Sequence, residues 1–164
     1  KFMPFNEQEE HDKAILLKWF ESGSDILTRE NEIAHLTASA WVVSPKKSVL
    51  MAYHNIYHSW AWLGGHADGD ADLHHVAQKE VMEESGLTHV KFLLDEPFSI
   101  EILSVDGHMK KGHYVSTHLH LNVTYLMEAD RASSKGRAIR QVEILSNKLL
   151  TTAFEASLEC VTVM

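Results

Sequence analysis

The sequence has almost no cysteine and little proline: Cys160 is the only cysteine among 164 residues, and there are three prolines. One cysteine cannot form an intramolecular disulfide, which excludes the disulfide-stapled class of small proteins and fits a reducing, cytoplasmic compartment. No apolar run reaches the roughly 18 residues that a membrane span needs, so we expect no membrane as a partner. The sequence therefore predicts a protein whose stability comes from a buried apolar core.

Positive charge is also scarce. Fifteen Lys and Arg stand against 23 Asp and Glu, which gives a formal net charge of −8. This balance argues against nucleic acid as a partner, because nucleic-acid binding neutralises phosphates with basic side chains. A site for a small phosphorylated molecule needs imported positive charge, and a metal ion is the simplest source.

What the sequence does contain is ordinary globular composition, with 45% hydrophobic and 23% charged residues. We expect one domain over residues 1–164, with an N-terminal helical extension (1–34), a core (35–127) and a C-terminal helical segment (128–164). Twelve histidines are scattered from His11 to His120, which does not indicate a metal-storage tract. The N-terminal helix leaves two roles open, because it could cover the sheet edge or join a homodimer interface.

Apolar spacing and turn residues predict the order of the elements. Strands are predicted at 35–43, 48–54, 90–94, 98–105 and 113–126, helices at 6–21, 72–85 and 139–158, a helical turn at 24–30, a loop at 55–71 and a polar break at 130–136. The first two strands form a hairpin across the turn at 44–47. Strands before, between and after helices argue for the α/β class, with a central mixed sheet that helices cover.

Three carboxylates project from one arc of the predicted helix 72–85. At about 100° per residue, Glu83 and Glu84 fall roughly 60° and 40° to either side of Glu80. Like charges this close repel one another, and a hard divalent cation relieves the repulsion; oxygen ligands select Mg²⁺ or Mn²⁺ over zinc. Three glutamates alone are also compatible with a solvent-exposed acidic face that binds nothing. Gly64, Gly65 and the acidic loop before the helix favour a metal site instead.

The stretch from Gly65 to Leu87 resembles the signature of the Nudix hydrolases. In that signature five residues separate a Gly from a Glu, and seven more residues separate this Glu from Arg-Glu-apolar-any-Glu-Glu-any-Gly-apolar. Here the run KEVMEESGL ends the motif with the spacing intact. Two positions depart, because Ala71 stands at the first Glu and Lys79 at the Arg. Three nearby aspartates are candidates to substitute in part: Asp68, Asp70 and Asp72.

The resemblance implies a Nudix-like α/β/α sandwich and a metal-dependent hydrolase. Its reaction is cleavage of a diphosphate linkage in a nucleoside diphosphate derivative or a similar organic pyrophosphate. The implied residues are Glu80, Glu83 and Glu84 as ligands of Mg²⁺ (or Mn²⁺) and catalytic groups, Lys79 as their support, and Gly64, Gly65, His66 and Trp60 in contact with substrate. A further carboxylate from a later segment is drawn from Glu101, Asp106 and Glu128.

Two alternatives to this function stay open. The first is a Nudix-like nucleotide-binding or regulatory module without turnover, which Ala71 and Lys79 favour and the complete glutamate set opposes. The second is a prenyl diphosphate isomerase, which needs a well-placed cysteine, and Cys160 is far away in sequence.

His118 and His120 share a strand face and could line a substrate cleft or bind a metal, but with no third ligand in view we favour ordinary half-buried residues. Trp62 could stack on a nucleobase, and we favour packing of the glycine turn. We interpret His74 and His75 as solvent-side residues of the helix.

Overall fold

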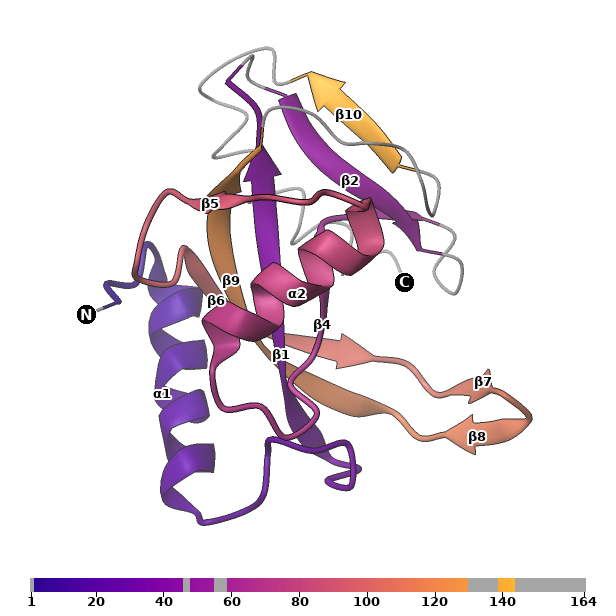
Figure 1. Cartoon of the computed structure of the whole chain (residues 1–164). Helices are drawn as coiled ribbons and strands as arrows, with labels where there is room; N and C mark the ends of the chain where they lie inside the picture. Colours follow the sequence, from indigo (N-terminus) through magenta and orange to yellow (C-terminus); the bar gives the residue numbers. More distant parts are fainter. Residues whose placement is uncertain (1, 46–47, 55–58, 130–138, 144–164) are drawn as a thin grey trace.

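Strand β1 (Ala34–Val43) lies at the centre of an eight-stranded mixed sheet in the computed structural model (Figure 1). The structure describes residues 2–45, 48–54, 59–129 and 139–143, so Lys46, Lys47, the polar break at 130–136 and Cys160 lie outside the described residues. The other strands are β2 (Ser48–His54), β3 (Ser59–Ala61), β4 (Leu63–His66), β5 (Lys91–Phe92), β6 (Ser99–Val105), β7 (His108–Lys110), β8 (His113–Val115), β9 (His118–Glu128) and β10 (Ile139–Glu143).

The strand order confirms the mixed sheet. The main path is β10-β2-β1-β9-β5, with β3 paired to β2, β4 to β1 and β6 to β9. β1 and β9 pair in parallel along ten residues, from Ala34 opposite Leu119 to Val43 opposite Glu128. The other pairings within this sheet are antiparallel, including the predicted β1–β2 hairpin.

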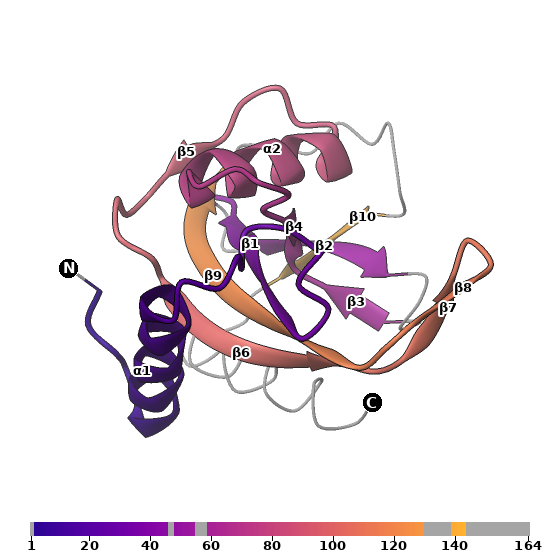
Figure 2. The ribbon, with the colours of Figure 1, turned by 90° about the horizontal axis from the view of Figure 1, so that it is seen from below.

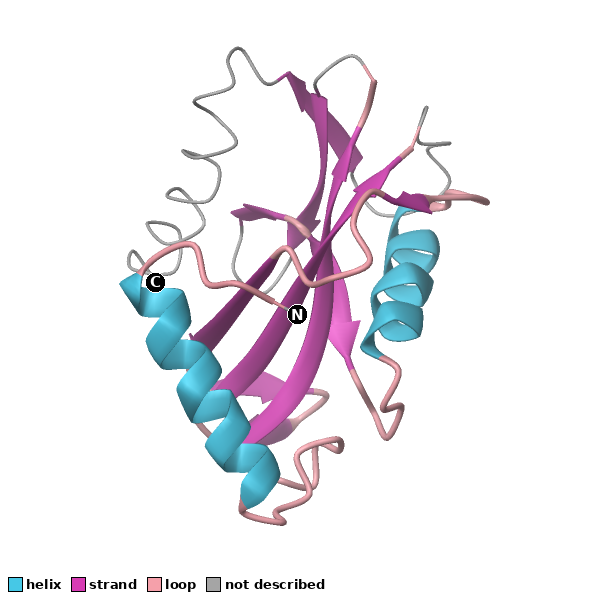
Figure 3. Ribbon diagram, turned by 90° about the vertical axis from the view of Figure 1, so that its left-hand side faces the viewer, coloured by secondary structure: helices cyan, strands magenta, loops and turns pink. Residues whose placement is uncertain are grey.

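The two described helices lie on opposite sides of the sheet (Figures 2 and 3), which confirms the α/β class with a helix-covered mixed sheet. Helix α1 (Glu7–Glu21) begins after Asn6, whose side chain accepts a hydrogen bond from the backbone N–H of Glu9 at 2.9 Å. Asp12 accepts from the backbone N–H of Ile102 at 3.1 Å, and this bond holds α1 along β6. The N-terminal helix therefore covers an edge of its own sheet. None of the helices in the described part of the chain is long and apolar enough to cross a membrane.

Helix α2 (Leu73–Ser85) packs on one face of β1. Its buried residues Val76, Ala77 and Val81 belong to the same core cluster as every second residue of β1. Alternate residues of a strand point to opposite faces, so the remaining side chains of β1 point away from α2. Gly86 ends the helix with a φ of 72° in the left-handed region, as the sequence predicts.

The prediction of a loop at 55–71 is wrong in the middle of that range, where the chain forms β3 and β4. Four residues of β4 pair antiparallel with β1, from His66 opposite Thr37 to Leu63 opposite Ala40. Two of these four residues are glycines, and glycine weakens a strand signal because it has no side chain to pack. The neighbouring strand supplies the pairing that the local sequence does not predict.

The helix predicted at 139–158 is also wrong at its start. Residues 139–143 form β10, which pairs antiparallel with β2 from Ile139 opposite Ala52 to Glu143 opposite Ser48. The rest of that predicted helix lies outside the described residues.

Two smaller predictions need correction as well. The strand predicted at 113–126 divides into β8 and β9, and β8 pairs with the unpredicted β7. Lys111 and Gly112 form the two-residue turn between β7 and β8, with φ values of 51° and 84°. The helical turn predicted at 24–30 is a series of bends and turns, in which Asp25 accepts from the backbone N–H of Leu27 at 2.9 Å.

Candidate functional site

The six residues between β4 and α2 (67–72) are tied to the segment that precedes β1. Arg29 forms a two-pronged ion pair with Asp68, with 2.7 Å between Nε and Oδ1 and 2.5 Å between Nη2 and Oδ2. The backbone N–H of Gly69 donates to the carbonyl of Leu27 at 2.9 Å. Asp68 and Gly69 both have positive φ, 48° and 94°, which turns the chain toward the helix. The loop before the carboxylate helix therefore has a defined position.

Two further aspartates fix the first turn of α2. The Asp72 side chain caps the helix and accepts from the backbone N–H of His75 at 3.1 Å. Asp70 Oδ2 lies 2.7 Å from His75 Nδ1, and this hydrogen bond holds the pKa of Asp70 below its ordinary value. The Nudix signature has a glutamate where Ala71 stands, and in this chain the residues on both sides of Ala71 tie the loop to the helix.

The glycine pair on β4, Gly64 and Gly65, lies very close to β1 and to the side chain of Glu80. A Cβ on Gly64 would lie 2.7 Å from the Cα of Ser39 and 2.8 Å from the carbonyl oxygen of Ala38, both on β1. A Cβ on Gly65 would overlap the side chain of Glu80. The absence of a side chain at these positions thus lets β4 approach β1 on one face and lets a helix carboxylate lie on the strand on the other.

The three helix glutamates differ in burial and in partners. The Glu80 side chain is 20% exposed and Glu83 is 61% exposed. Burial raises the pKa of Glu80, and the positive charge of Lys79 opposes this shift. Lys79 Nζ lies 3.6 Å from Glu80 Oε1 and 4.0 Å from Glu83 Oε1, so the predicted contact with Glu83 is present and Glu80 is the closer partner. Glu84 Oε2 accepts from the backbone N–H of Gly64 at 3.3 Å.

The donor set of α2 fits a hard divalent cation in its chemistry, because it consists of carboxylate oxygens. A half-buried carboxylate with a raised pKa, such as that of Glu80, is stabilised in its charged form by a nearby cation. The three side chains are not gathered around one point: the described residues contain one group of three or more His, Cys, Asp or Glu with ligand atoms within 4.8 Å of one another, and it consists of histidines. A cation on α2 thus requires the glutamates to close around it.

A buried polar network lies on the face of the sheet that points away from α2. Glu101 Oε2 accepts from Asn122 Nδ2 at 2.9 Å and from Thr124 Oγ1 at 3.1 Å, and Glu101 Oε1 accepts from Ser99 Oγ. Thr37 Oγ1 donates to Asn122 Oδ1 at 2.9 Å. Burial raises the pKa of Glu101, and its hydrogen bonds oppose the shift.

Two substitutions of Glu101 are expected to show whether the network needs the negative charge of this side chain or only its shape and hydrogen bonds. Glu101→Gln keeps an acceptor for Asn122 and Thr124 and presents a donor to the Ser99 hydroxyl, so we expect the free energy of unfolding to stay the same or to rise. Glu101→Ala removes the acceptor that Ser99, Asn122 and Thr124 share, although Asn122 and Thr124 keep their hydrogen bonds to Ser39. We expect a loss of about 2–3 kcal/mol in the free energy of unfolding. Urea unfolding at neutral pH measures both. If Glu101→Gln destabilised the protein as much as Glu101→Ala, the ionised carboxylate would be required.

The other candidates for a further carboxylate lie apart from this network. Asp106 is exposed directly after β6, and Glu128 is half-buried at the end of β9. Glu101 points to the face of the sheet away from α2, where it bonds to Asn122. The choice among the three therefore stays a prediction.

The aromatic residues near the glycine pair take part in packing. Trp62 lies 5.6 Å from Trp41 between ring centroids and belongs to a small apolar cluster, which confirms the packing interpretation. Trp60 on β3 lies edge-on to Tyr53, with 5.4 Å between centroids.

The two histidines in the first turn of α2 differ. His75 is exposed, as predicted. His74 is not a solvent-side residue, because its ring stacks on Phe92 with 4.4 Å between centroids and meets Tyr125 edge-on at 4.3 Å.

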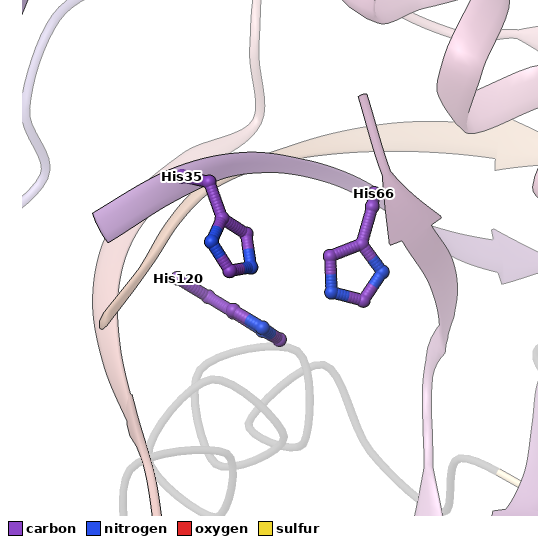
Figure 4. Close-up of side chains that lie close together, drawn as sticks. All are labelled: His35, His66 and His120. Carbon is purple, nitrogen blue, oxygen red and sulfur yellow. The ribbon is translucent and has the colours of Figure 1, made fainter. Parts of the chain in front are cut away.

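Three histidines from three strands meet on the face away from α2 (Figure 4). They are His35 on β1, His66 on β4 and His120 on β9, and His118 is beside them. Burial lowers the pKa of His66 to about 4 and that of His120 to about 2, and it also lowers the pKa of His35. His66, which the resemblance implies as a substrate contact, lies with these histidines on the face away from α2. Its contact with a substrate stays a prediction.

No family model matches the sequence, and no curated protein matches it. Solved structures that match the chain include a Nudix-family hydrolase from Clostridium perfringens, with a TM-score of 0.49 and 19% identity over 74% of this chain and 95% of that one. An Ap4A hydrolase from C. elegans has a TM-score of 0.49 and 17% identity over 77% of this chain and 92% of that one. A Nudix hydrolase from M. smegmatis has a TM-score of 0.45 and 16% identity over 74% and 76%.

Proposed function

We propose that this chain is a divalent-metal-dependent hydrolase of the Nudix type, which cleaves a diphosphate linkage in a nucleoside diphosphate derivative or a similar organic pyrophosphate. One observation supports this most strongly. The glutamates of α2 are folded back onto the glycine pair, because Glu80 lies over Gly65 and Glu84 accepts from the N–H of Gly64. A merely solvated acidic face gives no reason for two carboxylates to approach two adjacent glycines.

In this proposal Glu80, Glu83 and Glu84 hold the cation, with Mg²⁺ the expected ion and Mn²⁺ a substitute. When bound, the ion supplies charge neutralisation at the phosphate oxygens and polarises water. A carboxylate of α2 takes the proton of the attacking water. Lys79 keeps Glu80 and Glu83 in place through its two ion pairs. Trp60 is the candidate for stacking on a nucleobase.

A substrate panel tests the function. Nucleotide sugars, dinucleotides, nucleoside triphosphates and prenyl diphosphates are incubated with the full chain and Mg²⁺, and released phosphate or monophosphate is measured. We expect turnover of at least one compound, and EDTA should abolish it. Tight binding of a nucleotide without turnover would instead indicate the regulatory module, and an isomerised prenyl diphosphate would indicate the isomerase.

The two glycines are expected to respond differently to alanine. Gly65→Ala displaces the flexible carboxylate of Glu80, so we expect activity to fall by about 10–100-fold with little change in stability. Gly64→Ala presses on the backbone of β1, so we expect a loss of about 1–3 kcal/mol in the free energy of unfolding. Steady-state kinetics and urea unfolding of both variants measure these effects. Equal destabilisation by the two substitutions would contradict the roles assigned to the pair.

A further inference from the structure

The histidine group on the far face of the sheet has the composition and spacing of a metal site. His35, His66 and His120 each offer one ring nitrogen, and these three nitrogens lie within 4.8 Å of one another. Figure 4 shows the three rings pointing toward one another from three different strands. Among the described residues, no other group of three or more His, Cys, Asp or Glu reaches this spacing.

The sheet itself sets the positions of the three rings. His35 lies directly opposite His120 in the parallel pairing of β1 with β9, and His66 lies opposite Thr37 in the pairing of β4 with β1. Side chains of directly paired residues project from the same face, so the backbone ladder places all three together. Ligands on strands are held more rigidly than ligands on loops, which favours a preorganised site.

His35 has the tautomer and the vacant nitrogen that a metal ligand needs. Its Nδ1 lies 3.0 Å from the carbonyl oxygen of Asn31, and a carbonyl only accepts, so this nitrogen carries the proton. Its Nε2 is therefore left with a lone pair, and it is buried without a hydrogen-bond partner among the described residues. A backbone carbonyl that fixes the far nitrogen is the arrangement found around metal-bound histidines.

His118 supports the group from the side. Its Nδ1 lies 2.8 Å from the carbonyl oxygen of Ser116, so its Nε2 carries the lone pair, and that nitrogen lies 3.3 Å from His120 Nε2. The His118 ring also stacks on His35, with 4.9 Å between centroids. His118 thus orients two of the three rings and is a positioning residue.

The donor chemistry selects the ion. Neutral imidazoles suit Zn²⁺ and neighbouring transition metals, whereas Mg²⁺ and Ca²⁺ need oxygen ligands. Three histidines with a fourth position open to water form a common zinc site. A Zn–N distance of about 2.0–2.1 Å requires the nitrogens to close by on the order of 1 Å from the 4.8 Å limit, which rotation of the half-buried rings of His66 and His120 allows.

We propose that His35, His66 and His120 bind one divalent transition-metal ion, with Zn²⁺ the best match, on the face of the sheet away from α2. This site is separate from the glutamates of α2, because Gly65 and His66 are adjacent on β4 and point to opposite faces. The bound ion joins β1, β4 and β9. The inference does not depend on the hydrolase activity, since it rests on a different face and a different ligand chemistry.

Zinc binding to the full chain tests the site. The metal-free protein is titrated with Zn²⁺ against a chromogenic chelator, and we expect one tight equivalent. His66→Gln and His120→Gln should each weaken binding by more than the roughly 10–100-fold that the loss of a supporting residue costs, and His118→Ala should weaken it within that range. His89→Ala, which removes an exposed histidine, and Glu84→Gln are controls that should bind as the wild type does.

A measurement on the wild-type protein keeps the test independent of how the variants fold. X-ray absorption at the zinc edge should show three imidazole ligands, and Co²⁺ in place of Zn²⁺ should give the visible absorption of a four-coordinate ion. The proposal is overturned if the wild type binds no Zn²⁺ tightly, if folded His66→Gln binds it normally, or if Glu84→Gln removes the binding.

Discussion

Glu84→Gln is expected to lower kcat by at least about 100-fold while the protein stays folded. Glutamine keeps an oxygen that can accept from the backbone N–H of Gly64, so the contact between α2 and β4 survives. What the substitution removes is the negative charge that a divalent cation needs. Steady-state kinetics on the best substrate of the panel, together with urea unfolding, measure the two quantities separately.

Glu7→Gln is the matched control, because Glu7 is 91% exposed on α1 and remote from the glycine pair. It should leave both kcat and the free energy of unfolding unchanged. Normal turnover by Glu84→Gln, or activity of the wild type in excess EDTA, would rule out a metal site on α2.

Acidification is expected to destabilise the metal-free protein strongly between pH 6.5 and about 4. Burial holds the pKa of His66 at about 4 and that of His120 at about 2, whereas histidines in an unfolded chain titrate near 6.5. Below 6.5 the unfolded chain therefore binds protons that the folded chain does not, and stability falls with falling pH. Each histidine contributes about 1.4 kcal/mol per pH unit, so the pair contributes roughly 3 kcal/mol per unit.

Nearby positive charges also lower the pKa values of His66 and His120, and only Asp68 raises the pKa of His66. Arg29 and Lys110 lower the pKa of His66 further, and Asp68 opposes them. Urea unfolding in EDTA across this pH range measures the slope. His66→Gln should flatten it by about 1.4 kcal/mol per unit, and the exposed His89→Gln should not change it. An unchanged slope in His66→Gln would show that His66 takes up a proton in the folded state.

Sequence reasoning succeeded for the fold where the signal is local. The helix predicted at 6–21 forms as α1, which begins one residue later at Glu7, and Gly86 ends α2 as predicted. Both boundaries depend on residues within one turn. The sequence does not predict β4 and β10, because each is stabilised by pairing with a distant strand, β4 with β1 and β10 with β2. The local sequence of a strand does not identify its partner.

The same distinction between local and distant contacts holds for the candidate site. The arc of Glu80, Glu83 and Glu84 follows from helix geometry and is present on α2, while its metal ligation and catalysis stay predictions. The sequence leaves metal binding by His118 and His120 open but shows no third ligand, because the group depends on the register that sets His35 opposite His120, a property of two strands 85 residues apart. The high number of histidines, twelve in all, indicates that some of them could bind a metal, but it does not identify the three that lie together.

The parallel pairing of β1 with β9 has a consequence for how the chain reaches this fold. Partners such as Thr37 and Asn122 are 85 residues apart, so the central pair forms only after a long loop has closed. The entropy of loop closure is lost before these contacts return any stability, which makes this step a slow one in refolding. β1 can pair early with β2 and β4, but its other edge stays bare until β9 arrives. An unpaired apolar edge is a template for other chains, so aggregation during refolding is expected to begin at the β9 side of β1.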